Sequence, residues 1–163
     1  MSIEKVRAYF ERCGIANRIQ EFPVSSATVE LAAEALHIAP CRIAKTLSFS
    51  VHDAPILVVT AGDAKVDNAK FKARFGVKAK MLSREDAEPL IGHAVGGVCP
   101  FAVKEGVAVY LDESLRRFET VFPAAGSSNS AIEMTCAELE KYSSNFVEWV
   151  DVCKAWREEE QTD

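Results

Sequence analysis

The stretch Arg42-Ile43-Ala44-Lys45-Thr46-Leu47-Ser48-Phe49-Ser50-Val51, followed by the apolar run Pro55–Ala61, decides the fold. The first stretch alternates like a strand with one face against a core. The second is almost continuously apolar, which predicts a central strand buried on both faces. Helical patterns lie on either side without a regular strand–helix alternation. Together these features predict an α+β fold, a single domain with a mixed, curved sheet flanked by helices.

The other elements are predicted from apolar spacing and from helix-capping residues. Thr135 and Glu138 form the pattern of a capping box. No dinucleotide-binding or phosphate-loop glycine motif is present. Helices are expected between Ser2 and Gly14, between Ser26 and Pro40, from Asp67 to Arg74, from Ser83 to Leu90 and from Thr135 to Tyr142, and short strands at 18–22, 107–111, 119–122, 131–135 and 146–152.

Composition indicates one globular domain. The chain has 163 residues, of which 48% are apolar and 26% charged, enough to form a core without disulfides or metal. The five cysteines are scattered and form no C-x-x-C pair, so we expect reduced thiols, no metal site and a cytoplasmic location. No stretch is long enough to span a membrane, and no signal peptide is recognisable at the N-terminus.

Charge is unevenly distributed along the chain. The total of -5 argues against a general nucleic-acid-coating protein. Residues 64–80, however, hold six basic residues against Asp67 alone, a local charge of +5, which leaves -10 for the remainder. This segment predicts either a solvated helix face or a local contact with phosphates. The residues expected to make that contact are Lys65, Lys70, Lys72 and Arg74.

Lys45 interrupts the apolar face of the first strand. Because side chains alternate along a strand, Lys45 shares its face with Ile43 and Leu47. An ammonium on such a face is usually paired or functional, since burying it alone is costly. Two interpretations stay open: a lysine that points into a functional cavity, and one whose stem packs while its head reaches water.

The loop Gly96-Gly97-Val98-Cys99-Pro100 is the second candidate feature. Adjacent glycines allow positive φ and close approach of the backbone to a ligand, and backbone N–H groups there can stabilise an oxyanion. A plain turn is the alternative. Cys99 is the best-placed cysteine for a nucleophile, but no general base lies beside it in the sequence, and His93 is equally well explained as a surface residue.

Several stretches, taken in order, carry a resemblance that covers roughly residues 20 to 150. They are Glu30–Leu36, Ile43–Leu47, Gly62, Val66-Asp67, Lys70, Gly96–Phe101, Val109–Asp112, Leu115, Phe118, Ala125-Gly126 and Ile132-Glu133. Their order and spacing resemble the YbaK / prolyl-tRNA synthetase-associated editing family. The resemblance implies one domain over 1–163 with a compact, barrel-like mixed sheet, ending in an acidic tail at 157–163.

The resemblance also implies an activity, the hydrolysis in trans of the ester of mischarged tRNA carrying a small amino acid. It implies catalysis by Lys45 with backbone groups of Gly96 and Gly97 and a positioned water, and needs no metal or cofactor. The implied partners are the tRNA acceptor end and prolyl-tRNA synthetase or another synthetase, with no DNA and no membrane. The residues implied in substrate binding are Thr46, Val98, Pro100, Gly126 and Asn129.

Departures from the family pattern bear on the amino acid. The cysteine-specific branch has Ser and Asp where this chain has Ala124 and Ala131, and Ala125 replaces a glycine. The polar loop 126–130 is more similar to the alanine- or serine/threonine-directed branches. The resemblance therefore favours tRNA(Pro) carrying Ala, or Ser or Thr, over Cys.

Two other classes of function remain open at this point. One is a non-catalytic module of the same fold that binds tRNA or a synthetase through the basic segment. The other is a small-molecule-binding regulatory protein. Three outcomes distinguish the classes. A deacylase hydrolyses its substrate in a way that depends on Lys45, and a binding module still binds tRNA after Lys45 is replaced. A small-molecule-binding protein binds a metabolite and has no affinity for tRNA.

Overall fold

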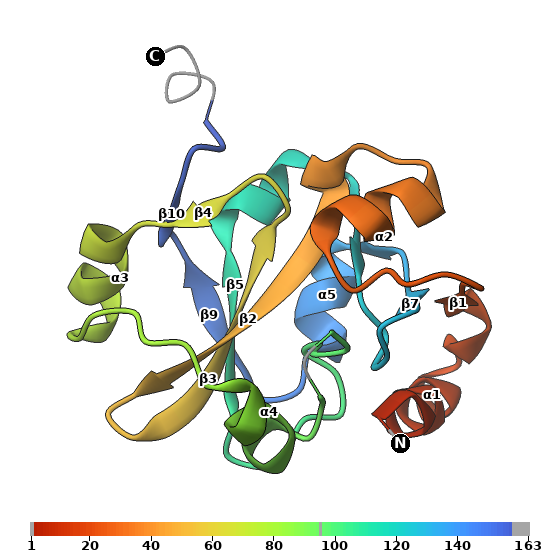
Figure 1. The fold of residues 1–163 in the computed structure, drawn as a ribbon, viewed down its shortest axis with the longest axis horizontal. Helices are drawn as coiled ribbons and strands as arrows, with labels where there is room; N and C mark the ends of the chain where they lie inside the picture. The colour runs from red at the N-terminus through yellow and green to blue at the C-terminus, as the bar shows by residue number, and fades with distance from the viewer. Residues whose placement is uncertain (1, 95, 158–163) are drawn as a thin grey trace.

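The two stretches that decide the fold form a hairpin at the centre of the sheet (Figure 1). In the computed structural model, which describes residues 2–94 and 96–157, β2 (Ile43–Val51) pairs from Ala44 to Val51 with the whole of β3 (Ala54–Ala61). Leu57, Val58 and Val59 are fully buried. The prediction of a central strand covered on both faces is therefore confirmed.

The main sheet has six strands in the order β8-β6-β2-β3-β5-β9. The outer strands are β5 (Ala108–Asp112), β6 (Thr120–Pro123), β8 (Met134–Thr135) and β9 (Phe146–Val150). Pairing is antiparallel for β2–β3 and β6–β8 and parallel for β2–β6, β3–β5 and β5–β9. This is the predicted α+β domain, with a mixed sheet curled into a half-barrel and helices around it.

Two short sheets accompany the main one. β1 (Gln20–Glu21) pairs with β7 (Ser130–Ala131), and β4 (Lys65–Val66) pairs with β10 (Cys153–Lys154). The strand expected at 18–22 is shorter than predicted because Ala16–Arg18 form a 3-10 turn, η1. The strand expected at 131–135 is divided into β7 and β8, because the chain changes its pairing partner there from β1 to β6.

The expected helices are present. They are α1 (Ser2–Cys13), α2 (Val29–Leu36), α3 (Asn68–Phe75), α4 (Arg84–Ile91) and α5 (Cys136–Tyr142), with 3-10 turns η2 (Pro40–Arg42) and η3 (Glu113–Arg117). The capping box of α5 is confirmed. The cap of α2 is Thr28 rather than the expected Ser26. The Ser2 side chain and the tail beyond Arg157 lie outside the described residues.

Aromatic side chains attach the helices to the sheet. Phe71 of α3 lies with its ring centroid 4.9 Å from Phe49 of β2 and 4.6 Å from Phe75. Phe10 of α1 makes an edge contact with Phe101 at 4.8 Å. Because Phe101 follows the glycine loop directly, α1 helps to hold that loop in place.

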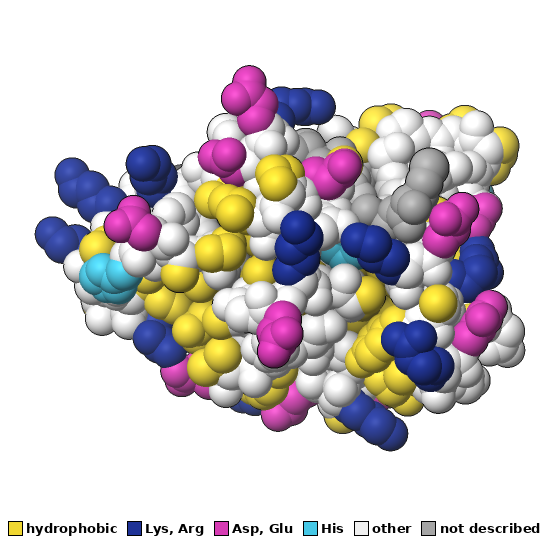
Figure 2. Space-filling model, turned by 90° about the horizontal axis from the view of Figure 1, so that it is seen from below, with side chains coloured by type: hydrophobic (Ala, Val, Ile, Leu, Met, Phe, Trp, Pro, Cys, Tyr) yellow, Lys and Arg dark blue, Asp and Glu magenta, His cyan; other side chains and the backbone are white. Residues whose placement is uncertain are grey.

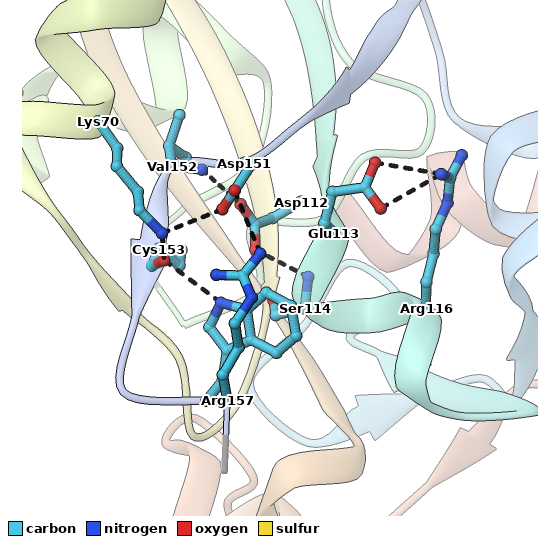
Figure 3. Close-up of polar contacts among 10 residues, drawn as sticks. Lys70, Asp112, Glu113, Ser114, Arg116, Asp151, Val152, Cys153 and Arg157 are labelled. Carbon is cyan, nitrogen blue, oxygen red and sulfur yellow. Dashed lines mark hydrogen bonds and ion pairs between the residues drawn. The ribbon is translucent and has the colours of Figure 1, made fainter. Parts of the chain in front are cut away.

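A buried carboxylate ties the C-terminal segment to the sheet (Figure 3). Asp112 at the end of β5 is fully buried. Its two oxygens accept hydrogen bonds from the backbone N–H of Ser114 at 3.0 Å and of Val152 at 2.9 Å. The segment held in this way continues into β10, which pairs with β4.

Replacing Asp112 with alanine is expected to lower the free energy of unfolding by about 3 kcal/mol, because two buried N–H groups lose their acceptor. Urea denaturation measures the effect. The matched control is Asp151→Ala, whose carboxylate makes only surface ion pairs with Lys70 and Arg157 and should cost less than about 1 kcal/mol. Equal losses for the two variants would contradict this account of the C-terminal attachment.

Candidate functional site

A pocket of about 380 Å³ opens beside Lys45. It lies between β2, the start of α2, the segment 81–84, the glycine loop and the 124–131 region, and its volume is within the range of small-molecule sites. Most of the lining is small and neutral. The lining residues are Ser26, Ala27, Thr28, Val29, Ala32, Ile43, Ala44, Lys45, Thr46, Ser48, Met81, Leu82, Arg84, Gly96, Val98, Phe122, Ala124, Ser130 and Ala131.

Lys45 is half-buried in the wall of this pocket. Its Nζ donates a hydrogen bond to the carbonyl oxygen of Ala64 at 2.6 Å. Burial lowers the pKa of the Lys45 ammonium from its ordinary value, and this is the largest influence on it. An ammonium has three donors, so one bond to Ala64 leaves others for a ligand. Of the two interpretations of Lys45, the structure supports the lysine that faces a cavity.

The carbonyl that holds Lys45 is itself positioned by the C-terminal strand. Ala64 is fully buried and directly precedes β4, which pairs with β10. Cys153 of β10 is also buried and lies close enough to Lys45 to influence its charge. The lysine head is therefore fixed by backbone from a distant part of the sequence.

Thr46 lies at a break in the pairing of one edge of β2. On that edge, Ala44 pairs with Pro123 of β6, and the Ser48 carbonyl accepts a hydrogen bond from the backbone N–H of Leu82. Thr46 is two residues from each and so shares this edge, between the two partners. Its hydroxyl oxygen is buried without a hydrogen-bond partner among the described residues. The break therefore leaves the Thr46 hydroxyl at the pocket wall.

The glycine loop uses its two glycines in different ways. Gly96 has a φ of 97° and lines the pocket with Val98. A side chain on Gly97 would lie 2.9 Å from backbone atoms of Gly126 and Ser127, and the Gly97 N–H already donates to the carbonyl of Ala94. The close approach at Gly97 is thus to another loop of the protein.

Cys99 is not placed for nucleophilic catalysis. It is fully buried, and burial raises the pKa of its thiol to about 12. His93 is also fully buried rather than at the surface, and burial lowers its pKa. Its Nε2 lies 2.7 Å from the Phe101 carbonyl oxygen and 3.6 Å from the Cys99 sulfur. The cysteine-nucleophile hypothesis is therefore wrong, because a thiol held in the core is neutral and inaccessible. All five cysteines are free.

The pocket brings together some of the residues implied by the resemblance and not others. Lys45, Thr46, Gly96 and Val98 line it. Gly97 and Gly126 instead line a neighbouring pocket of about 680 Å³.

The remaining two substrate-binding residues of that set bind the protein's own backbone. Pro100 is buried, and its carbonyl accepts a hydrogen bond from the N–H of Ser144. The Asn129 side chain donates a hydrogen bond to the carbonyl oxygen of Phe22, and the backbone N–H of Phe22 donates one to the backbone carbonyl oxygen of Asn129. These contacts support the walls of the pocket, while a direct role of Pro100 and Asn129 in substrate binding stays a prediction.

The basic segment of the sequence does not form one basic surface. Lys70 is paired with Asp151 and donates to the Cys153 carbonyl, as Figure 3 shows. Arg74 pairs with Glu148 of β9 and stacks over aromatic rings. Lys72 is exposed, and Lys65 is exposed and close enough to Lys45 to repel its charge. Binding of tRNA by these four residues stays a prediction.

Sequence reasoning missed several lining residues. Ser26 and Thr28 lie just before α2. In the sequence, residues of this type at that place indicate only a helix cap, not a pocket wall. Ser130 lies in the polar loop that the sequence singled out. Arg84 gave no signal of its own, yet with Lys45 it is one of two charged residues in the described lining, and both are basic.

Within residues 2–94 and 96–157, no group of three or more His, Cys, Asp or Glu side chains is assembled as a metal site. In the same part of the chain, no helix is long and apolar enough to cross a membrane.

The curled mixed sheet carries a pocket with a lysine in its wall and the glycine loop beside it. Residues 24–142 match the family model of the aminoacyl-tRNA editing domain, and the chain belongs to that family. The resemblance seen in the sequence is thereby confirmed.

The chain is similar to curated proteins and to a solved structure. It is 52% identical over 157 residues to the uncharacterized protein YwhH of Bacillus subtilis (strain 168), covering 96% of this chain and 99% of that protein. It is 28% identical over 90 residues to the proline–tRNA ligase of Geobacillus sp. (strain WCH70), covering 55% of this chain but only 16% of the ligase. The fold is similar to a crystal structure described as a candidate trans-editing enzyme for prolyl-tRNA synthetase, with a TM-score of 0.83 and 26% identity, covering 94% of this chain and 97% of that one.

Proposed function

We propose that this protein is a cytoplasmic trans-editing deacylase that hydrolyses the ester bond of tRNA mischarged with a small amino acid. The first substrate to consider is tRNA(Pro) carrying Ala, followed by Ser or Thr. The observation that carries the proposal is Lys45, a partly desolvated ammonium held by Ala64 in the wall of a pocket of ligand size. The proposed partners are the acceptor end of tRNA and a synthetase, with prolyl-tRNA synthetase favoured by the similarity to its sequence.

The proposed mechanism relies on electrostatics and positioning. Lys45 donates a hydrogen bond to the ester carbonyl oxygen and stabilises the negative charge that develops there when water attacks the carbonyl carbon. The acyl C–O bond then breaks, the ribose oxygen takes a proton, and free amino acid and tRNA leave. No carboxylate or imidazole is present in the described lining. The attacking water therefore loses its proton to the substrate or to solvent.

The pocket wall supports an aminoacyl group with a small, uncharged side chain. Ala124 and Ala131 both line the pocket and lie opposite each other in a β-bridge. They stand where the resemblance places Ser and Asp in cysteine-directed relatives, so the polar groups expected to hold a thiol substrate are absent from these positions. Editing of small residues is physically useful, because a proline pocket discriminates against smaller ligands by only about 1–3 kcal/mol.

A panel of charged tRNAs tests the proposal. tRNA(Pro) bearing Ala, Ser, Thr, Cys or Pro is incubated with the protein, and loss of the labelled amino acid is followed over time. We expect at least one of Ala, Ser and Thr to be released faster than Cys and Pro. Decay of every charged tRNA at the rate seen in buffer would overturn the proposal and favour a module that only binds.

A further inference from the structure

We propose that Arg84 and Met81 form the docking point for the 3′ end of the tRNA, with Arg84 on a backbone phosphate and Met81 against the terminal base. This inference rests on the proposed function and assigns nucleotide contacts to two residues of the same pocket. Both residues line the pocket and lie within one short segment, 81–84, at the start of α4.

Arg84 is the cation most available to a ligand at the pocket. It is exposed, and among the described residues its guanidinium has no ion-pair or hydrogen-bond partner. No acidic side chain is present in the described lining to neutralise it. A guanidinium forms two parallel hydrogen bonds with a phosphate, which makes an unpaired arginine well suited to this contact.

Met81 supplies the apolar half of the docking point. It is 58% exposed, which is high for a large apolar side chain, and it still contributes to the pocket lining. A polarisable thioether packs well against a flat aromatic ring. The backbone of this segment is held firmly, because Leu82 donates to the Ser48 carbonyl and Lys80 accepts from the Ser50 N–H. Figure 2, a view from the side of α4, shows basic and hydrophobic side chains next to one another on this face.

The basic helix α3 is less suited to this contact. Lys70 and Arg74 are both paired with acidic residues of the C-terminal segment. A phosphate would have to displace those carboxylates, whereas Arg84 has none to displace. The positive charge that binds the phosphate is therefore expected to come from Arg84, which lies outside the segment with the highest local charge in the sequence.

Three substrates separate the phosphate contact from the base contact. They are an aminoacylated acceptor-stem minihelix, an aminoacyl-adenosine without phosphate, and an aminoacyl ethyl ester without either. Arg84→Ala should raise KM for the minihelix about tenfold with little change in kcat. It should also reduce the slope of log KM against log salt by about 0.7. Neither smaller substrate should be affected.

Met81→Ala should raise KM for the minihelix and for aminoacyl-adenosine, and should leave the ethyl ester unchanged. The matched control for charge is Arg12→Ala, since Arg12 is an exposed arginine of α1 outside the lining of this pocket. If Arg84→Ala keeps the wild-type KM and salt slope, or if Arg74→Ala produces the loss in its place, the inference is overturned.

Binding keeps this inference separate from the proposed function. If the wild-type protein hydrolyses no substrate, the proposed function fails. Docking can still be measured by fluorescence anisotropy with an oligonucleotide that ends in CCA and carries no amino acid. Weaker binding by Arg84→Ala than by Arg12→Ala would support the docking point, and equal binding would overturn it.

Discussion

Replacing Lys45 with alanine is expected to lower kcat/KM for the mischarged tRNA by about 100- to 1,000-fold, the usual effect of removing one donor that stabilises a developing oxyanion. The loss should appear mainly in kcat, because the charge on the ester oxygen exists only in the transition state. Single-turnover deacylation, which follows the chemical step directly, measures it. Retention of more than about a tenth of the wild-type rate would show that Lys45 is not a catalytic group.

Two further variants test the reason for this loss. Lys45→Met keeps most of the packed stem but removes the ammonium, and should be as inactive as Lys45→Ala while remaining folded. Lys154→Ala, an exposed lysine on β10, is the charge-matched control and should act like the wild type. Because burial lowers the pKa of Lys45, its ammonium is lost at a lower pH than that of an exposed lysine. Activity should therefore fall on the alkaline side once spontaneous ester hydrolysis is subtracted.

Replacing Gly97 with valine is expected to abolish activity and to lower the free energy of unfolding by about 3 kcal/mol or more. A Cβ at this position lies 2.9 Å from backbone atoms of Gly126 and Ser127, so one loop has to move. Movement of either loop shifts Gly96, Val98 or Ser130 in the pocket wall. Urea denaturation and deacylation measured on the same preparation give both quantities.

The control for Gly97 is a glycine with open space around it. Gly106 has a φ of 90°, and apart from its two chain neighbours no described residue has an atom within 4 Å of the position that a Cβ would occupy there. Gly106→Ala should cost about 1–2 kcal/mol from backbone strain alone and should leave activity unchanged. If Gly97→Val is as stable as the wild type, the two loops are not packed as the structure shows.

Local chemistry explains which features could be predicted from the sequence. The strands at 43–51 and 54–61 follow from apolar patterning, and the caps at Asp67, Ser83 and Thr135 follow from the orphan N–H groups of helix starts. Lys45 was identified because it breaks an apolar face. Each of these signals depends only on residues that are near one another in the sequence.

The features that were missed depend on contacts between distant segments. His93 gave no sign of burial, because Phe101 and α1, which cover this region, are brought there by the tertiary fold. Likewise, the partners of Lys70 and Arg74 lie about eighty residues further along the chain. A local charge count therefore overstated the charge that α3 offers to a ligand.

By itself, the sequence determined the class of fold, the two central strands, the family and Lys45 as a candidate site residue, because hydrophobic period and capping are local properties and the order of motifs can be read along the chain. Only the tertiary structure decided how the site is assembled. It showed that the Ala64 carbonyl holds Lys45, that Gly97 packs against a second loop, and that the Arg84 side chain at the pocket has no partner among the described residues. These arrangements arise from long-range packing and charge pairing, which depend on which segments the fold brings together.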